Sequence, residues 1–106
     1  MSILETLIEF ESGLIRVRNV NGSSNHPKDR NGKSWKEHWT DRSVKFWPSE
    51  CCCCNKSEKT VGELVGAHVC SERSKKQYIV PLCKRCNKLT DTFLVRRDML
   101  VPVADE

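Results

Sequence analysis

Residues 51–54 read Cys-Cys-Cys-Cys and residues 83–86 read Cys-Lys-Arg-Cys, so each stretch places two cysteines three positions apart. Four thiolates from two such turns can complete a tetrahedral shell around one ion, because each turn brings two sulfurs to the metal while backbone N–H groups point at them. The pattern predicts a structural zinc site with the ligands Cys51, Cys54, Cys83 and Cys86. The register of the first turn stays open, since Cys52 or Cys53 could also serve there.

The length and composition agree with a fold that needs a metal. The chain has 106 residues, of which 38% are hydrophobic, and a chain of this size buries only about 60–70% of its unfolded surface. Its seven cysteines are an odd number, which fits a complete disulfide framework poorly. The sequence shows neither a signal-peptide pattern nor a membrane-spanning stretch, so we expect a cytoplasmic, reducing location and no membrane partner. The net charge of +4 indicates little about partners by itself.

The residues between and after the two cysteine turns predict a hairpin followed by short elements. Two apolar runs, 63–69 and 77–82, are separated by a polar and basic connection, which is typical of a β-hairpin. Asn55, directly after the first turn, suits a left-handed backbone. Cys70 lies in the hairpin and is expected to behave as a small buried hydrophobe. The later elements are expected to be a helix of about two turns at 83–91, a strand at 93–95 and a packed tail at 100–103.

The first third of the chain predicts a helix, a strand and a loop. Ser2 and Glu5 have the spacing of a capping box, which indicates a short helix that ends near residue 12. Residues 14–20 carry β-branched side chains in the alternation of a strand. Residues 21–33 are rich in Asn, Ser, Gly and charge, as in an exposed loop.

A second capping box, at Ser34 and Glu37, predicts another short helix. Trp35, His38 and Trp39 lie three and four positions apart, so they share one helix face. We expect this aromatic stripe to be part of the core, because an exposed pair of Trp side chains would be an apolar liability. The fold class that follows is α+β. We expect a single domain over residues 1–106, in which an N-terminal extension, 1–50, packs on a small zinc-stabilised module, 51–106.

The order of these elements resembles that of a known family. A CxxC turn, a hairpin and a second CxxC that opens a helix is the order of a treble-clef zinc finger. The stretches Cys51-x-x-Cys54, Gly66-Ala67-His68-Val69 and Pro81-Leu82-Cys83-Lys84-Arg85-Cys86-Asn87 resemble the zinc-containing branch of the HNH, or ββα-metal, endonucleases, most nearly the phage recombination endonuclease seven type. The resemblance covers residues 51 to about 91 and leaves the first fifty residues outside it.

This resemblance implies a metal-dependent DNA endonuclease. The zinc would be structural, and a second cation such as Mg²⁺ would contact the scissile phosphate. His68 would be the general base that takes a proton from water, and Asn87 would offer its side-chain oxygen to the cation. The residues that would neutralise DNA phosphates are Lys75, Lys76, Lys84, Arg85 and Lys88, with Arg73 beside them.

The chain departs from the family pattern at one position. Ala67 stands where the endonuclease seven type has an acidic cation ligand. Asp91 is the best substitute, because on a helix it would share a face with Asn87. Without the acid, a second hypothesis is a protein of a phage or mobile element that has lost catalysis and uses the zinc module to dock on a protein partner. On that hypothesis His68 forms a hydrogen bond inside the core and Asn87 braces the cysteine turn.

Overall fold

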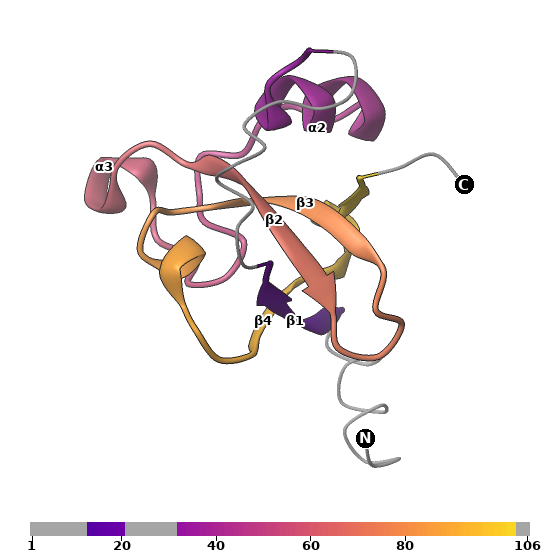
Figure 1. The fold of residues 1–106 in the computed structure, drawn as a ribbon. Helices are drawn as coiled ribbons and strands as arrows, with labels where there is room; N and C mark the ends of the chain where they lie inside the picture. The colour runs from indigo at the N-terminus through magenta and orange to yellow at the C-terminus, as the bar shows by residue number, and fades with distance from the viewer. Residues whose placement is uncertain (1–12, 21–31, 104–106) are drawn as a thin grey trace.

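The computed structural model describes residues 13–20 and 32–103, and within them the chain forms one five-stranded antiparallel sheet with short helices, so the α+β prediction is confirmed (Figure 1). The strand order in the sheet is β4-β1-β2-β3-β5. The elements are β1 (Leu14–Asn19), α2 (Trp35–Ser43), α3 (Glu58–Val61), β2 (Val65–Ser71), β3 (Gln77–Leu82), η2 (Cys86–Lys88), β4 (Phe93–Arg96), η3 (Arg97–Met99) and β5 (Val101–Pro102). The helix expected before residue 12 and most of the loop expected at 21–33 lie outside the described residues.

The predicted hairpin is confirmed, and strand β1 lies inside the sheet rather than at its edge. Strands β2 and β3 pair from Val65 opposite Leu82 to Cys70 opposite Gln77. Strand β1 pairs with β2 on one side and with β4 on the other. The strand predicted at 93–95 and the packed tail at 100–103 are present as β4 and β5, and β5 pairs with the outer edge of β3. Residues from the first fifty therefore contribute a central strand.

Successive side chains of β2 point to opposite faces of the sheet, and their burial alternates accordingly. Ala67, Val69 and Ser71 are buried on one face, and the residues between them point to the other. The second face carries Gly66 and His68 and is covered by α2, which lies above the sheet in Figure 1. Strand β3 lies between β2 and β5 and contacts α2, which agrees with its burial along most of its length.

Helix α2 begins and packs as its sequence predicts. The Ser34 side chain accepts a hydrogen bond of 3.1 Å from the backbone N–H of Glu37, which caps the helix. Trp39 is fully buried, and its indole Nε1–H donates to the carbonyl of Met99 at 2.8 Å. His38 is buried as well and donates from Nε2 to the carbonyl of Pro102 at 2.9 Å. The aromatic stripe is core, and it ties α2 to the last strand.

Helix α3 is a single turn from Glu58 to Val61, and Ser57 is its N-cap. The Ser57 side chain accepts a hydrogen bond from the backbone N–H of Lys59 at 3.2 Å, and an isolated bridge pairs Glu50 with Ser57.

Within the described part of the chain, no helix combines the length and the apolar character that crossing a bilayer would require.

The two-turn helix expected at 83–91 is wrong, because the structure has only the 3-10 turn η2 there. Leu89 leaves the helical region with φ −62° and ψ 135°. The side chain of Asn19 donates from Nδ2 to the carbonyls of Cys86 (3.1 Å) and Leu89 (3.0 Å). A tertiary contact from β1 thus occupies carbonyls that a longer helix would use. Since the helix is the closing element of a treble clef, that finer prediction is not confirmed.

We predict that Gly66→Ala destabilises the fold. A Cβ atom at this position would lie 2.8 Å from the Cβ of Trp35 and 3.0 Å from its carbonyl carbon, so α2 would have to move away from the sheet. Overpacking of this kind costs about 1–3 kcal/mol. The measurement is the urea midpoint at a fixed zinc concentration, and Gly66→Val should lower that midpoint further. An unchanged midpoint for both variants would contradict the close packing of α2 on β2.

Candidate metal centre

The first cysteine turn is held in place by its own backbone and by β3. The N–H of Asn55 donates to the carbonyl of Cys51 at 2.9 Å, and the N–H of Cys51 donates to Lys56 at 3.0 Å. Asn55 has φ 63°, which confirms the left-handed conformation predicted for it. The N–H of Cys52 donates to the carbonyl of Pro81 at 3.1 Å, so this turn sits beside the end of β3, where the second turn begins.

The structure brings the two cysteine pairs together, as the spacing predicted. The Sγ atoms of the four predicted ligands all lie within 4.8 Å of one another, and those of Cys54 and Cys83 are 4.0 Å apart. A tetrahedral shell with Zn–S bonds of about 2.3 Å separates its sulfurs by about 3.8 Å. Small movements of the thiols would therefore close the shell. The cysteine tetrad, as we name Cys51, Cys54, Cys83 and Cys86, fits a metal ion such as Zn²⁺ in its number of donors, their chemistry and their spacing.

Backbone N–H groups surround the sulfurs of the tetrad. The N–H groups of Cys53 and Cys83 donate to the Sγ of Cys51 at 3.4 and 3.3 Å, and the N–H of Cys86 donates to the Sγ of Cys83 at 3.4 Å. Hydrogen bonds of this kind favour the thiolate, which is the form that binds metals. They also orient the sulfurs of Cys51 and Cys83, because the donors belong to the turns that carry the ligands.

The raised pKa values within the tetrad show that a bound cation would have to stabilise the thiolates against the effect of burial. Burial raises the pKa of Cys54 and of Cys86. Burial acts in the same direction at Cys51, but backbone hydrogen bonds from Cys83, Cys54 and Cys53 outweigh it and lower the pKa of Cys51 to about 7. A divalent cation at the centre would stabilise all of these thiolates and displace their protons.

The two remaining cysteines of the run lie differently. Cys52 is 2% exposed, and burial raises its pKa to about 12, which favours the thiol. The half-buried Cys53 lies beside Cys86, and burial raises its pKa too. Among the described residues, the one group of side chains spaced for a metal contains Cys51 and Cys54 from the run and neither of the cysteines between them.

A pocket of about 310 Å³ opens beside the tetrad. Its cations are Lys56 and Arg85, and its apolar wall is formed by Val61 and Leu89. Sequence analysis did not single out Lys56, whose only signal is its place directly after Asn55. Asn19, which holds the η2 turn, was missed as well, because nothing near residue 19 in the sequence indicates a partner some seventy positions away.

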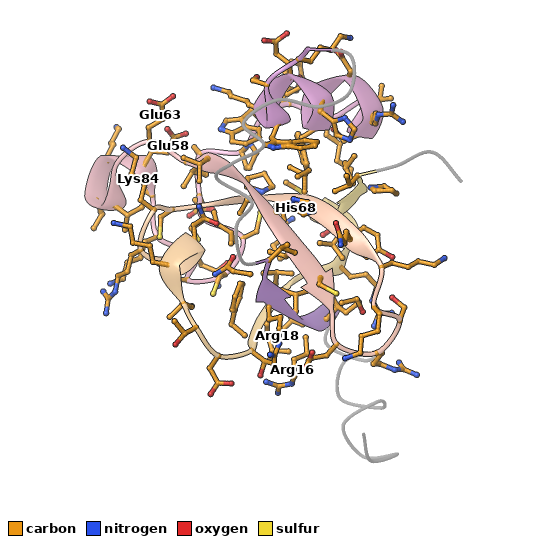
Figure 2. All side chains as sticks on the ribbon, in the orientation of Figure 1. Arg16, Arg18, Glu58, Glu63, His68 and Lys84 are labelled. Atoms are coloured by element: carbon orange, nitrogen blue, oxygen red, sulfur yellow. The ribbon has the colours of Figure 1, made fainter. Side chains whose placement is uncertain are left out.

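His68 and η2, the turn that contains Asn87, lie on opposite faces of the sheet. Asn19 lies opposite Val69 in the sheet, so the two side chains point to the same face. On that face the Asn19 side chain holds η2. His68 points to the opposite face, towards α2 (Figure 2). Its ring centroid lies 5.7 Å from that of Trp35. Its Nε2 forms a hydrogen bond of 2.7 Å with the Oε1 of Gln77.

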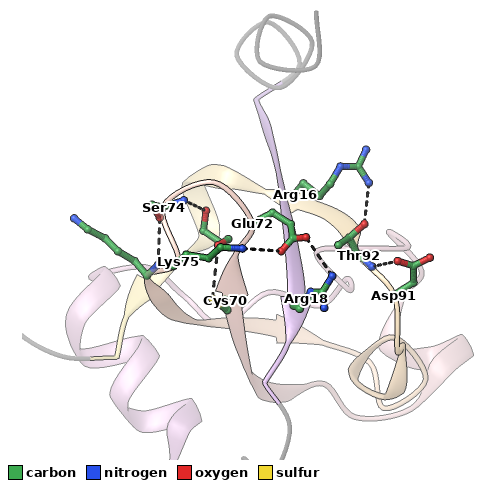
Figure 3. A network of polar contacts seen from close by, with 10 residues as sticks. Arg16, Arg18, Cys70, Glu72, Ser74, Lys75, Asp91 and Thr92 are labelled. Carbon is green, nitrogen blue, oxygen red and sulfur yellow. Dashed lines mark hydrogen bonds and ion pairs between the residues drawn. The ribbon is translucent and has the colours of Figure 1, made fainter. Parts of the chain in front are cut away.

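Asp91, the substitute considered for the missing acidic ligand, does not share a helix with Asn87. Ala67 is 1% exposed and belongs to the hydrophobic core. Asp91 follows η2 without a helix between them, so the prediction that it shares a face with Asn87 is wrong. Its carboxylate accepts a hydrogen bond of 2.7 Å from the N–H of Thr92 (Figure 3).

The residues predicted to contact nucleic acid form two separate groups. Lys84, Arg85 and Lys88 are exposed around the second cysteine turn, with Lys84 on the same side of the molecule as Glu58 and Glu63 (Figure 2). Lys75 and Lys76 lie in the connection at the other end of β3, about 20 Å away along a six-residue strand. Lys75 lies 3.6 Å from Glu72, a carboxylate that also accepts from Arg18 at 3.2 Å (Figure 3).

Comparisons with protein-family models, with curated proteins and with solved structures find no significant match to this chain. The interpretation of the site therefore depends on its residues and their geometry.

Zinc affinity is predicted to rise with pH. The thiols of Cys54 and Cys86 have raised pKa values and are protonated near neutral pH, so zinc must displace their protons. Each displaced proton increases the affinity by up to about tenfold per pH unit. Below about pH 7 the thiol of Cys51 also holds a proton, and the slope should become steeper. Competition with a coloured chelator at several pH values measures this dependence, and a flat profile would contradict thiolate ligation.

Proposed function

We propose that this chain is a structural-zinc protein that binds nucleic acid, DNA in the first instance, through the cations of its second cysteine turn. The observation that carries the proposal is the exposure of Lys84 and Arg85 between two buried residues of the tetrad, Cys83 and Cys86. A metal that fixes the turn would fix the backbone from which both cations project, so less backbone order would have to be gained when they contact phosphates.

The cations of the turn itself suit an anionic ligand, while Glu58 and Glu63 lie on the same side of the molecule as Lys84 (Figure 2). From residue 83 to residue 90 the sequence has four basic or amide side chains and no acidic one. Arg85 and Lys56 line the same pocket. Phosphate contacts made by such cations position a nucleic acid without reading its sequence.

We propose binding rather than cleavage. A ββα-metal mechanism needs the general base and the cation ligand at one phosphate, whereas the turn that contains Asn87 is held on the face of the sheet opposite to that of His68. The nuclease hypothesis is tested by incubating supercoiled plasmid with the zinc-loaded protein and Mg²⁺ or Mn²⁺. Nicking that is lost in His68→Ala would overturn our preference.

The binding experiment compares two triple variants with the same change in charge. We expect the triple variant with Lys84→Gln, Arg85→Gln and Lys88→Gln to bind DNA more weakly. The plot of log K against log salt should also become less steep, its slope falling in magnitude by about 3, roughly one for each lost phosphate contact. The matched control neutralises Arg73, Lys75 and Lys76 at the hairpin tip, where Glu72 already pairs with Lys75. This control variant should reduce the magnitude of the slope of log K against log salt by less.

Two outcomes would contradict the proposed function. One is an equal loss of slope in both triple variants, which would show a nonspecific effect of net charge. The other is the absence of DNA binding by the zinc-loaded protein at low salt, which would favour the hypothesis of a protein partner.

A further inference from the structure

The segment after α2 presents two large apolar side chains to solvent. Val44 is 89% exposed and Phe46 is 98% exposed. Val44 is also the C-cap of α2 and has a left-handed backbone with φ 57°. Glycine or asparagine is usual at such a cap, and a β-branched residue adopts this conformation only with strain. Neither the strain nor the exposed apolar surface stabilises the isolated fold, so the segment is a candidate for contact with another molecule.

Residues 43–47, which we name the Phe46 loop, are fixed on both sides of Phe46. The backbone N–H of Lys45 donates to the hydroxyl of Ser43 at 3.1 Å, and the Lys45 ammonium donates to the backbone carbonyl of Asp98. On the other side, the Trp47 ring packs edge-on against the buried Trp39, with the ring centroids 5.5 Å apart. The aromatic ring of Phe46 is therefore carried outward by a loop that is already ordered, which lowers the entropy cost of binding.

The charge around the Phe46 loop is positive. The Lys36 ammonium lies 5.2 Å from the centre of the Trp47 ring, and Lys45 is part of the loop itself. The sequence has no Asp or Glu between Arg42 and Ser49. Of the acids near the loop, Asp41 pairs with Lys33 and Asp98 with Arg96, and Glu50 follows three positions after Trp47.

We infer that the Phe46 loop binds single-stranded nucleic acid, with the Phe46 ring stacked on an unpaired base and the ammonium groups of Lys36 and Lys45 close to the flanking phosphates. A fully exposed aromatic ring beside cations is the arrangement with which proteins hold single strands. A duplex hides the faces of its bases in the stack, so this loop should prefer unpaired strands. An apolar pocket of a protein partner would accept the ring too, but it would gain nothing from the surrounding cations.

This binding surface is separate from the cysteine turn of the proposed function. Helix α2 covers the face of the sheet that carries Gly66 and His68, whereas Asn19 holds η2 on the opposite face. Variants of the two surfaces should therefore act independently, and one proposal can fail without the other.

The test is fluorescence anisotropy of a labelled oligodeoxythymidylate with the zinc-loaded protein at low salt. We expect Phe46→Ala to weaken binding about five- to hundredfold, the range found when one stacked aromatic is removed. Phe46→Trp should bind as well as the original chain or better. Phe46→Leu, which keeps an apolar side chain but has no ring, should behave like Phe46→Ala. The same substitutions should leave the affinity for a duplex within about twofold.

Three results would overturn the inference. They are the absence of oligodeoxythymidylate binding, equal binding by Phe46→Ala and the original chain, and equal binding by Phe46→Leu and Phe46→Trp. The last would show that an apolar side chain suffices and that no ring stacks on a base. Because the Phe46 side chain is 98% exposed, these variants should keep the unfolding midpoint of the original chain, and circular dichroism verifies this before binding is compared.

Discussion

Replacing Cys83 by serine should abolish zinc binding and unfold the protein. Cys83 is fully buried, its Sγ lies 4.0 Å from that of Cys54, and its own N–H donates to the Sγ of Cys51. Thiolate zinc sites contribute about 10–16 kcal/mol in small zinc-binding peptides, which is as large as the whole stability of a typical domain. The loss of one ligand therefore removes enough binding free energy to favour the unfolded chain.

The measurement combines metal analysis with circular dichroism. The original chain should carry one equivalent of zinc and unfold when a strong chelator removes it. Cys70→Ser is the matched control, because the same substitution there alters a half-buried thiol of β2 that lies outside the tetrad. It should keep one zinc and change stability by no more than about 1 kcal/mol. A folded Cys83→Ser protein, or an original chain unaffected by full chelation, would contradict a structural zinc site.

Trp39→Ala should be the most destabilising substitution outside the tetrad. The side chain is fully buried between α2 and the sheet, it packs edge-on against Trp47, and its indole holds the carbonyl of Met99. Removal of a buried Trp costs about 3–5 kcal/mol, a large share of the about 5–15 kcal/mol that stabilises a typical domain.

A second variant separates packing from hydrogen bonding. Trp39→Phe keeps most of the apolar volume but leaves the buried carbonyl of Met99 without this donor, so it should cost about 1–3 kcal/mol. Phe46→Ala, in an exposed aromatic of the following loop, should stay within about 0.5 kcal/mol of the original chain. All three are compared by urea unfolding at one free zinc concentration, because bound metal shifts the apparent stability. Equal midpoints for Trp39→Ala and Phe46→Ala would contradict the core that the structure shows.

Local patterns in the sequence were sufficient for the elements whose signals lie within a few residues. The capping box at Ser34 predicted the start of α2, and the polar connection between two apolar runs predicted the β2–β3 hairpin. The left-handed backbone of Asn55 followed from its place after a cysteine turn. These features depend on hydrogen bonds and side-chain preferences between near neighbours, which the order of residues expresses directly.

The candidate site was predicted only in part. The clustering of the four cysteines followed from their paired spacing. Their neighbours did not follow, because the faces of the sheet on which His68 and Asn87 lie depend on strand pairing and on where η2 ends. The exposure of Phe46 was not predictable either. Which of the two neighbouring aromatic residues is buried depends on the tertiary contact between Trp47 and Trp39.

The sequence by itself thus determined which thiols can share an ion, which segments form the hairpin and α2, and which aromatic residues of α2 are core. Only the tertiary structure decided that β1 lies between β2 and β4, that Asn19 holds the turn after Cys86, and that this turn lies on the face of the sheet opposite to that of His68. The physical reason is the range of the interactions. Periodicity, capping and paired cysteine spacing act within one turn or strand, whereas strand order and the ends of elements are set by contacts between residues far apart in the chain, which no local pattern records.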